Sequence, residues 1–211
     1  MPDMRQAPDM WGSRTSSCKV VSRRISDQFS PVSPYIGHNG LALRIEVAML
    51  RTMQSDSQIL EAVQQAFMGC VRPAHFTNYN HCDECEEHDE VLRSRDVRTL
   101  TMKDVGNIGW DPLCFISPAG FAYYFPALAR LALAEPTEQG WYGAQLLFHL
   151  SCEGRGERMS ACTPEQRRAV VLYLRHLVET RFEIAERYLC DEDLLLTVAL
   201  WSGDAGTDAN V

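Results

Sequence analysis

Apolar side chains recur at intervals of three and four residues through most of the chain after residue 54, which is the spacing of one face of an α-helix. The pattern predicts helices over residues 55–69, 81–93, 118–132, 141–150, 163–189 and 191–201. Segments with the alternating pattern of a half-buried strand are almost absent. The sequence therefore predicts a mainly α fold, a single compact domain of five to six helices with little or no sheet.

Two of these helices begin with residues that cap a helix N-terminus. Ser55 followed by Gln58 forms a capping-box pattern. Thr163-Pro164 followed by Gln166 combines an N-cap threonine, a proline at the first helical position and the same reciprocal partner three residues later. The helix that starts at Thr163 is the longest, so we expect it to be the main structural element of the fold.

The middle of the chain has less regular signals. Ser117-Pro118 predicts a helix start, and Pro126 should kink that helix because proline lacks the backbone N–H. The apolar run 114–116 fits a strand fragment or a buried extended segment, and three residues do not decide between them. The glycine-rich residues 153–156 predict a loop, and Asp191 is expected to cap the last helix.

The first 54 residues differ in composition from the rest of the chain. They are rich in Ser, Pro, Arg and Gly and show no sustained apolar period before Leu41, which predicts a disordered N-terminal extension. Three origins fit it: a start codon assigned too far upstream of Met49 or Met53, a functional disordered tail, or a transit peptide containing the Arg- and Ser-rich stretch 11–24. The helical domain then spans residues 55–202, and residues 203–211 form a disordered tail.

Charge and hydropathy exclude two classes of partner. The chain has a net charge of −8, and because residues 1–54 carry +3, the remaining residues carry −11. A body this acidic repels phosphate backbones and argues against nucleic-acid binding. No stretch reaches the roughly 18 apolar residues of a membrane span, and no secretory signal precedes the domain. We therefore expect a cytoplasmic protein whose oligomeric state the sequence does not indicate.

A cytoplasmic location predicts that the cysteines are thiols, because glutathione and thioredoxin keep cytosolic cysteines reduced. Five of them occur inside apolar patterns and are expected to be small buried hydrophobic residues. These five are Cys70, Cys114, Cys152, Cys162 and Cys190.

The segment 81–90, with the sequence HCDECEEHDE, is the most unusual feature of the chain. On a helix at about 100° per residue, His81, Cys85 and His88 fall on one stripe. Imidazole and thiolate are ligands that zinc prefers. The stripe therefore predicts a Zn²⁺ ion held by these three residues, with Cys82 or His75 completing the site. The spacing does not match a two-knuckle zinc ribbon, because no second cysteine pair follows.

Four other interpretations of the same segment stay open. The stripe also fits the buried face of an amphipathic helix, with hydrogen-bonded histidines and no metal. His88-Asp89 is similar to the His-Asp pair of helical metal-dependent phosphohydrolases, which need further ligands such as His149 or His176. Cys82 and Cys85 have the CxxC spacing of redox proteins, although the neighbouring acids disfavour reactive thiolates. An acidic face could instead bind a basic protein partner, and it consists of Asp83, Glu86, Glu87 and Glu90.

Arg181 is a further anomaly, because it falls in the middle of the apolar face of the long helix. A buried guanidinium needs a carboxylate or backbone carbonyls as partners. Arg181 either extends its charged end to solvent from an exposed helix end or binds an anion.

Two segments carry a resemblance to a known family. FISPAGFAYYFPAL at 115–128 resembles an "apolar run, Thr/Ser-Pro, aromatic, Tyr-Tyr, Leu-Pro-Ala" segment, and TPEQRRAV at 163–170 resembles a "Thr-x-x-Gln-Arg-x-Ala-Val" helix start. Both segments resemble those of a family of uncharacterised bacterial proteins classed as a domain of unknown function. Close members of that family are also associated with a His-Cys-x-Glu-Cys-x-Glu-His-Asp block, which resembles residues 81–89 here. The resemblance covers residues 57–201. It implies a compact helical bacterial domain and no particular activity.

Overall fold

The computed structural model describes residues 54–138, 140–152 and 154–203. The chain divides after Arg51 into two units, and all described residues belong to the second unit, Thr52–Val211. The predictions for the N-terminal extension, including the alternative starts at Met49 and Met53, and for the tail after residue 203 lie outside the described residues.

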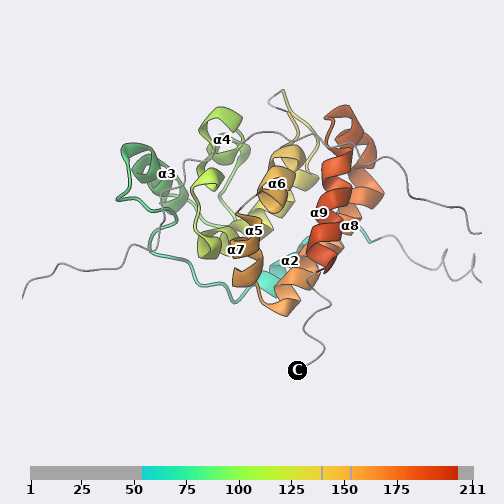
Figure 1. Cartoon of the computed structure of the whole chain (residues 1–211), viewed down its shortest axis with the longest axis horizontal. Coiled ribbons are helices and arrows are strands. Elements are labelled where there is room, and N and C mark those ends of the chain that lie inside the picture. The colour runs from blue at the N-terminus through green and yellow to red at the C-terminus, as the bar shows by residue number, and fades with distance from the viewer. Residues whose placement is uncertain (1–53, 139, 153, 204–211) are drawn as a thin grey trace, which may run out of the picture. The chain divides into compact units, whose positions relative to one another are not determined.

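The described residues form a helical domain (Figure 1). Its eight α-helices are α2 (Asp56–Phe67), α3 (Asp83–Arg93), α4 (Met102–Val105), α5 (Pro118–Leu133), α6 (Tyr142–Ser151), α7 (Arg155–Ala161), α8 (Pro164–Arg187) and α9 (Asp191–Gly203). Two 3₁₀ turns, η1 (Ile108–Trp110) and η2 (Pro112–Cys114), lie between α4 and α5. Among the described residues there is no strand, so the mainly α class is confirmed, while the helix count exceeds the five to six expected.

The two additional helices are short. α4 has four residues and α7 has seven, which is less than the window that a hydrophobic period needs to become recognisable. The prediction of a loop over residues 153–156 was wrong in part, because α7 begins at Arg155. The apolar run at 114–116 is not a strand, since Cys114 ends η2 and Ile116 lies just before the N-cap of α5.

The capping signals at Ser55 and Thr163 are confirmed. The Ser55 hydroxyl accepts a hydrogen bond from the Gln58 backbone N–H, and the Gln58 side chain accepts from the Ser55 N–H at 2.9 Å. Thr163 and Gln166 form the same reciprocal pair at the start of α8. Asp191 is the first residue of α9 rather than its cap. These interactions span three residues, which explains why the sequence alone predicts them well.

The centre of the core is α5, although α8 is the longest helix. Twelve of the sixteen residues of α5 are buried, and α2, α6, α7 and α8 pack around it. A helix that is apolar on all sides is buried on all sides, as α5 is. The helix continues through Pro126, and the kink expected there stays a prediction. At its end, the Trp141 indole donates to the Ala132 carbonyl at 2.8 Å.

Asp56 and Arg181 join α2 to α8. The Arg181 Nη2 group donates one hydrogen bond to Asp56 Oδ2 at 2.6 Å and a second to the Leu133 carbonyl at 2.7 Å. His176 Nε2 lies 2.7 Å from Asp56 Oδ1. The Arg181 guanidinium therefore does not extend to solvent, and it is not available to bind an external anion, because Asp56 and the Leu133 carbonyl are its partners within the fold.

α3 lies at the edge of the domain, on the side away from α8 and α9 (Figure 1). Its C-terminal end is anchored to α5 by the Tyr124 hydroxyl, which donates to the carbonyls of Leu92 and Arg95. The Arg72 guanidinium also donates to the carbonyl of Arg95, at 3.0 Å. These donors satisfy carbonyls that a helix end leaves without intrahelical partners, so the position of α3 is fixed. None of the described helices has the length and apolar character that crossing a membrane requires.

Candidate functional site

His81, Cys82 and Cys85 come together at the start of α3. The Cys82 and Cys85 sulfurs are 3.4 Å apart, and Cys85 Sγ lies 3.7 Å from His81 Nδ1. All three potential ligand atoms lie within 4.8 Å of one another. His81 and Cys82 are exposed, whereas Cys85 is buried, so the cluster opens toward solvent on one side.

The spacing of these atoms is that of ligands around one ion. A tetrahedral zinc with Zn–S of about 2.3 Å and Zn–N of about 2.05 Å places two sulfurs about 3.8 Å apart and a sulfur and a nitrogen about 3.6 Å apart. The observed 3.4 and 3.7 Å are close to these edges. A disulfide needs a sulfur separation of about 2.05 Å, so Cys82 and Cys85 are free thiols.

The chain before α3 explains how His81 reaches the thiols. Cys82 is the N-cap of α3, in an extended conformation and with no side-chain capping bond, so His81 precedes the helix. A helical stripe beginning at His81 was therefore not the right description of this segment. Burial, followed by the hydrogen bond and charge of Cys82, raises the pKa of Cys85 to about 11. The Cys85 thiol thus retains its proton until a cation displaces it.

The structure does not bring His88 to this cluster. Its side chain is 1% exposed and lies between Trp110 and Phe115, with ring centroids 4.8 and 5.0 Å away. His88 Nε2 is 3.6 Å from a Glu84 carboxylate oxygen, and neither ring nitrogen has a hydrogen-bond partner among the residues that the structure describes. His88 is one helical turn after Cys85 on α3, but its ring packs on Trp110 and Phe115 instead of turning toward the thiols.

His75 and Asp89 form a separate, structural pair. His75 Nδ1 lies 2.7 Å from Asp89 Oδ2, and the His75 ring stacks on Tyr79 at 3.8 Å. The other oxygen of Asp89 accepts from the backbone N–H groups of Phe76 and Thr77 at 2.6 and 3.2 Å. Asp89 therefore holds the preceding loop onto α3, and its carboxylate does not share a metal-binding point with His88 in the described structure.

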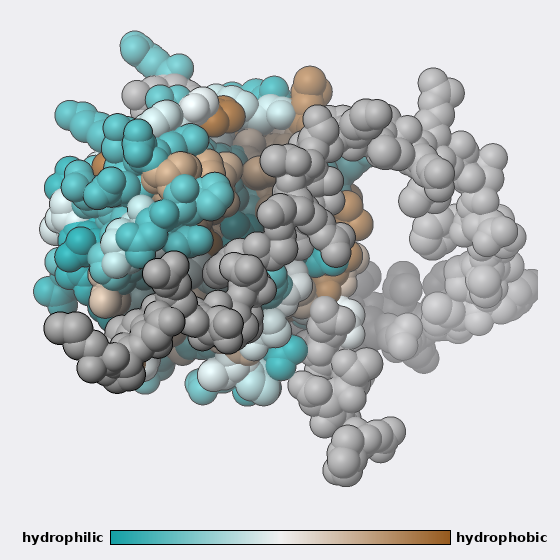
Figure 2. Space-filling model, turned by 60° about the vertical axis from the view of Figure 1, so that its left-hand side comes forward, coloured by the Kyte–Doolittle hydropathy of each residue, from teal (hydrophilic) through white to brown (hydrophobic). Residues whose placement is uncertain are grey.

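The acidic side of α3 faces solvent. Its four carboxylates are exposed, and they belong to Asp83, Glu86, Glu87 and Glu90. The face that comes forward from the left of Figure 1 is mainly hydrophilic in Figure 2. Exposed carboxylates raise the local concentration of cations, so this surface favours the approach of a divalent ion to the thiols.

A second group, Asp111, Cys114 and His149, also has potential ligand atoms within 4.8 Å of one another. Here the Asp111 oxygen and His149 Nε2 are only 2.6 Å apart, whereas an oxygen and a nitrogen on one zinc ion are about 3.4 Å apart. The pair is therefore a hydrogen bond rather than two metal ligands. Gln145 donates to the same Asp111 oxygen, and the Leu113 N–H donates to the other at 2.9 Å.

Cys152 and Arg158 complete the surroundings of His149. An Arg158 N–H contacts Cys152 Sγ at 3.4 Å and a second lies 3.1 Å from the Leu113 carbonyl. Burial alone would raise the pKa of Cys152, but its electrostatic interaction with the His149 side chain and the Arg158 charge lower it to about 7. Burial opposes the charging of His149 as well, yet its bond to Asp111 raises the His149 pKa.

Sequence reasoning missed this second cluster as a unit. Of the five cysteines expected to be buried, Cys162 and Cys190 are buried, whereas Cys70 and Cys152 are half-buried and Cys114 is exposed. His149 and Cys152 are three residues apart at the end of α6, which is a visible signal. Their partners come from distant parts of the chain, and no local pattern indicates them.

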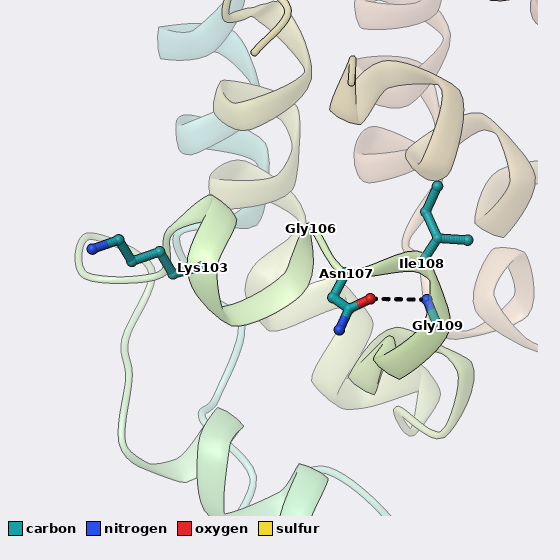
Figure 3. A pocket seen from close by; sticks show the side chains of 5 residues that line it. All are labelled: Lys103, Gly106, Asn107, Ile108 and Gly109. Carbon is teal, nitrogen blue, oxygen red and sulfur yellow. Dashed lines mark hydrogen bonds between the residues drawn. The ribbon is translucent and has the colours of Figure 1, made fainter. Parts of the chain in front are cut away.

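A pocket of about 510 Å³ lies between α4 and η1 (Figure 3). It is lined by Lys103, Gly106, Asn107, Ile108 and Gly109. The Asn107 side chain accepts from the Gly109 N–H at 3.1 Å, and Lys103 and Ile108 extend away from each other. The lining contains no carboxylate, thiol or imidazole, so the candidate chemistry lies elsewhere.

Comparison with protein families gives a match. The model of a family of unknown function (DUF6714) matches residues 55–194, which includes both clusters. Neither the comparison with curated proteins nor the comparison with solved structures finds a match.

Proposed function

Because the chain belongs to the family of unknown function DUF6714, its role has to be inferred from its own residues, and we propose that it is a zinc-binding domain. In this proposal His81, Cys82 and Cys85 hold one Zn²⁺ at the start of α3. The observation that carries the proposal is the spacing of their sulfur and nitrogen atoms, 3.4 and 3.7 Å, near the edges of a zinc tetrahedron.

The role that best fits this position is structural. The ligands lie within five consecutive residues, and the ion would fasten the turn that contains His81 to the first turn of α3. The Thr77 hydroxyl already donates to the Cys85 carbonyl at 2.6 Å, so the loop before α3 and the helix are one packed unit. Metal binding free energy appears as folding free energy, and the ion would stabilise this edge of the domain.

The site also leaves one coordination position for another donor. Three protein ligands leave the fourth position of a tetrahedral ion to water or to a donor atom of a partner. Since His81 and Cys82 are exposed, that position is on the surface, beside the acidic face of α3. We therefore assign a second role, interaction with a basic protein partner, to the same edge. Salt-sensitive association would support it, because salt screens charge pairs between exposed surfaces.

Cobalt titration of the full-length protein tests the ligand assignment. Co²⁺ bound by two thiolates gives a thiolate-to-cobalt charge-transfer absorption, and this band should saturate at about one ion per chain. Cys85→Ser and Cys82→Ser should each reduce the band by about half or abolish it. His88→Gln should leave it unchanged, and Cys162→Ser serves as the matched buried-thiol control. A full-strength band in the Cys82→Ser, Cys85→Ser double variant would refute the proposal.

A further inference from the structure

The cluster around His149 has the arrangement of an activated thiol. His149 Nε2 is engaged by Asp111 at 2.6 Å, which leaves Nδ1 as the only other ring nitrogen. His149 Nδ1 is buried and has no hydrogen-bond partner within the described parts of the chain. The Cys152 thiol donates to the His149 backbone carbonyl at 3.7 Å, so it lies beside His149, and the two side chains interact electrostatically. A nucleophile, a base and a carboxylate that orients the base thus occur in order.

Arg158 supplies the charge that a thiolate needs. The side chain of Arg158 is 6% exposed, and its N–H groups donate to the carbonyls of His149 and Leu113 and to Cys152 Sγ. Over residues 54–138, 140–152 and 154–203, no carboxylate forms an ion pair with it. A buried cation is costly unless an anion accompanies it, and the group in contact with Arg158 that can become an anion is the Cys152 thiol.

We propose that Cys152 is a reactive thiolate that is oxidised by hydroperoxides, with Arg158 stabilising its charge and His149 supplying a proton. The proposal is independent of the zinc site, since the two clusters share no residue. Cys152 is half-buried, so the reagent has to be small, as hydrogen peroxide is. Asp111 acts through His149 and is a positioning residue.

The reaction balances with hydrogen peroxide as the oxidant. The Cys152 thiolate attacks one peroxide oxygen, so that the S–O bond forms as the O–O bond breaks. The sulfur is oxidised by two electrons, and the peroxide is reduced by two. The departing hydroxide takes the proton of the His149 imidazolium and leaves as water. The products are a Cys152 sulfenic acid and neutral His149.

Cys114 provides an internal control for reactivity. It lies in the same cluster, and although the residue as a whole is exposed, partial desolvation of the thiol and the Asp111 charge raise its pKa to about 11. The pKa of Cys152 is about 7. At pH 7 the thiolate fraction of Cys152 is therefore several thousand times that of Cys114. A thiolate of lower pKa is intrinsically a weaker nucleophile, so the expected rate advantage of Cys152 over Cys114 is roughly 10²-fold.

The first test measures site-specific rates on the native full-length protein. Iodoacetamide alkylation, followed by peptide mass spectrometry, should modify Cys152 roughly 10²-fold faster than Cys114 at pH 7. After hydrogen peroxide treatment, dimedone should label Cys152, and the Cys152→Ser variant should lose that label. Equal rates at the two cysteines, or reaction of Cys152 only after unfolding, would overturn the proposal without any variant being needed.

The second test separates positioning from packing through the pH profile. The alkylation rate of Cys152 should have its midpoint near pH 7. Asp111→Asn keeps an oxygen for the Gln145 and His149 bonds, loses the acceptor of the Leu113 N–H and removes the charge; it should move the midpoint upward by about one pH unit. Among the described residues, the titratable or charged groups that act on Cys152 are His149 and Arg158, with Cys114 and Asp111 in the same cluster. An unchanged midpoint in a folded Asp111→Asn protein would contradict the role given to the His149–Asp111 pair.

Discussion

Asp89 should be one of the most important polar residues for stability, because it joins α3 to the loop before it. Its side chain is 2% exposed, and one carboxylate oxygen accepts the backbone N–H groups of Phe76 and Thr77. The other oxygen lies 2.7 Å from His75 Nδ1. Removing the carboxylate leaves two buried N–H groups without an acceptor, and each costs about 1–3 kcal/mol.

Two substitutions of Asp89 separate the loss of the acceptor from the loss of charge. Asp89→Ala removes both oxygens, so the free energy of unfolding should fall by about 3–5 kcal/mol. Asp89→Asn keeps one oxygen for the two N–H groups and should cost about 1–2 kcal/mol. Glu90→Ala, an exposed neighbour on α3, is the control and should change stability by less than about 0.5 kcal/mol.

Urea denaturation followed by circular dichroism measures these differences, with equal m-values showing that the same unfolding is compared. An Asp89→Ala protein within about 1 kcal/mol of the wild type would refute the structural role of this carboxylate. A gain in stability would instead indicate a carboxylate kept for chemistry at the expense of the fold, as in a metal-dependent hydrolase.

Three further changes test other contacts. Leu189 is 89% exposed with φ of 54°, so Leu189→Gly should raise the free energy of unfolding by about 1 kcal/mol, and a lower melting temperature would contradict this. Burial alone would raise the pKa of the Asp56 carboxyl, but His176 and Arg181 lower it below 3.8. The ionised Asp56 therefore stabilises the fold fully above the unfolded pKa of 3.8, and this contribution is lost as the pH falls through the folded pKa. Asp56→Asn should thus flatten the loss of stability between pH 4 and pH 2 and cost roughly 1 kcal/mol or less at pH 7, and parallel pH curves would refute the linkage. Tyr124→Phe should cost about 1–2 kcal/mol in urea denaturation, because the Leu92 and Arg95 carbonyls lose one of their donors; no change would mean that water replaces the hydroxyl.

The sequence predicts most of the long helices because their signals are local. The caps at Ser55 and Thr163 are contacts between residues three apart, and the apolar faces repeat over several turns. α4 and α7 are too short to show a period. The most enclosed helix was not predicted as the centre, because the length of α8 is visible in the sequence whereas the burial of α5 depends on four other helices.

The candidate metal site illustrates the limit of a helical projection. Projection places His81 and His88 on one stripe, but the stripe exists only where the backbone is helical. Cys82 is the N-cap, so His81 reaches the thiols from the preceding turn, while Trp110 and Phe115 enclose His88. The start of a helix is the least certain part of such a prediction, and here it decides which residues meet.

The second cluster depends on contacts that no local pattern encodes. Asp111 and His149 are 38 residues apart, and Arg158 reaches Leu113 over 45 residues. These groups meet because α6 and α7 both pack against α5 and because Asp111 and Leu113 join η2 to them. A cysteine three residues after a histidine is common in sequences, and it gains meaning only when a buried carboxylate and a guanidinium lie beside the pair.

The zinc content of the purified full-length protein tests the central claim most directly. Elemental analysis of folded protein, purified without chelator and equilibrated with Zn²⁺, should give about one zinc per chain. Cys85→Ala should lose the ion and melt at a lower temperature, while Cys162→Ala, a thiol of similar burial, should keep it. Folded wild-type protein without zinc, or a Cys85→Ala protein with the full zinc content, would contradict the assignment of the ion to the start of α3.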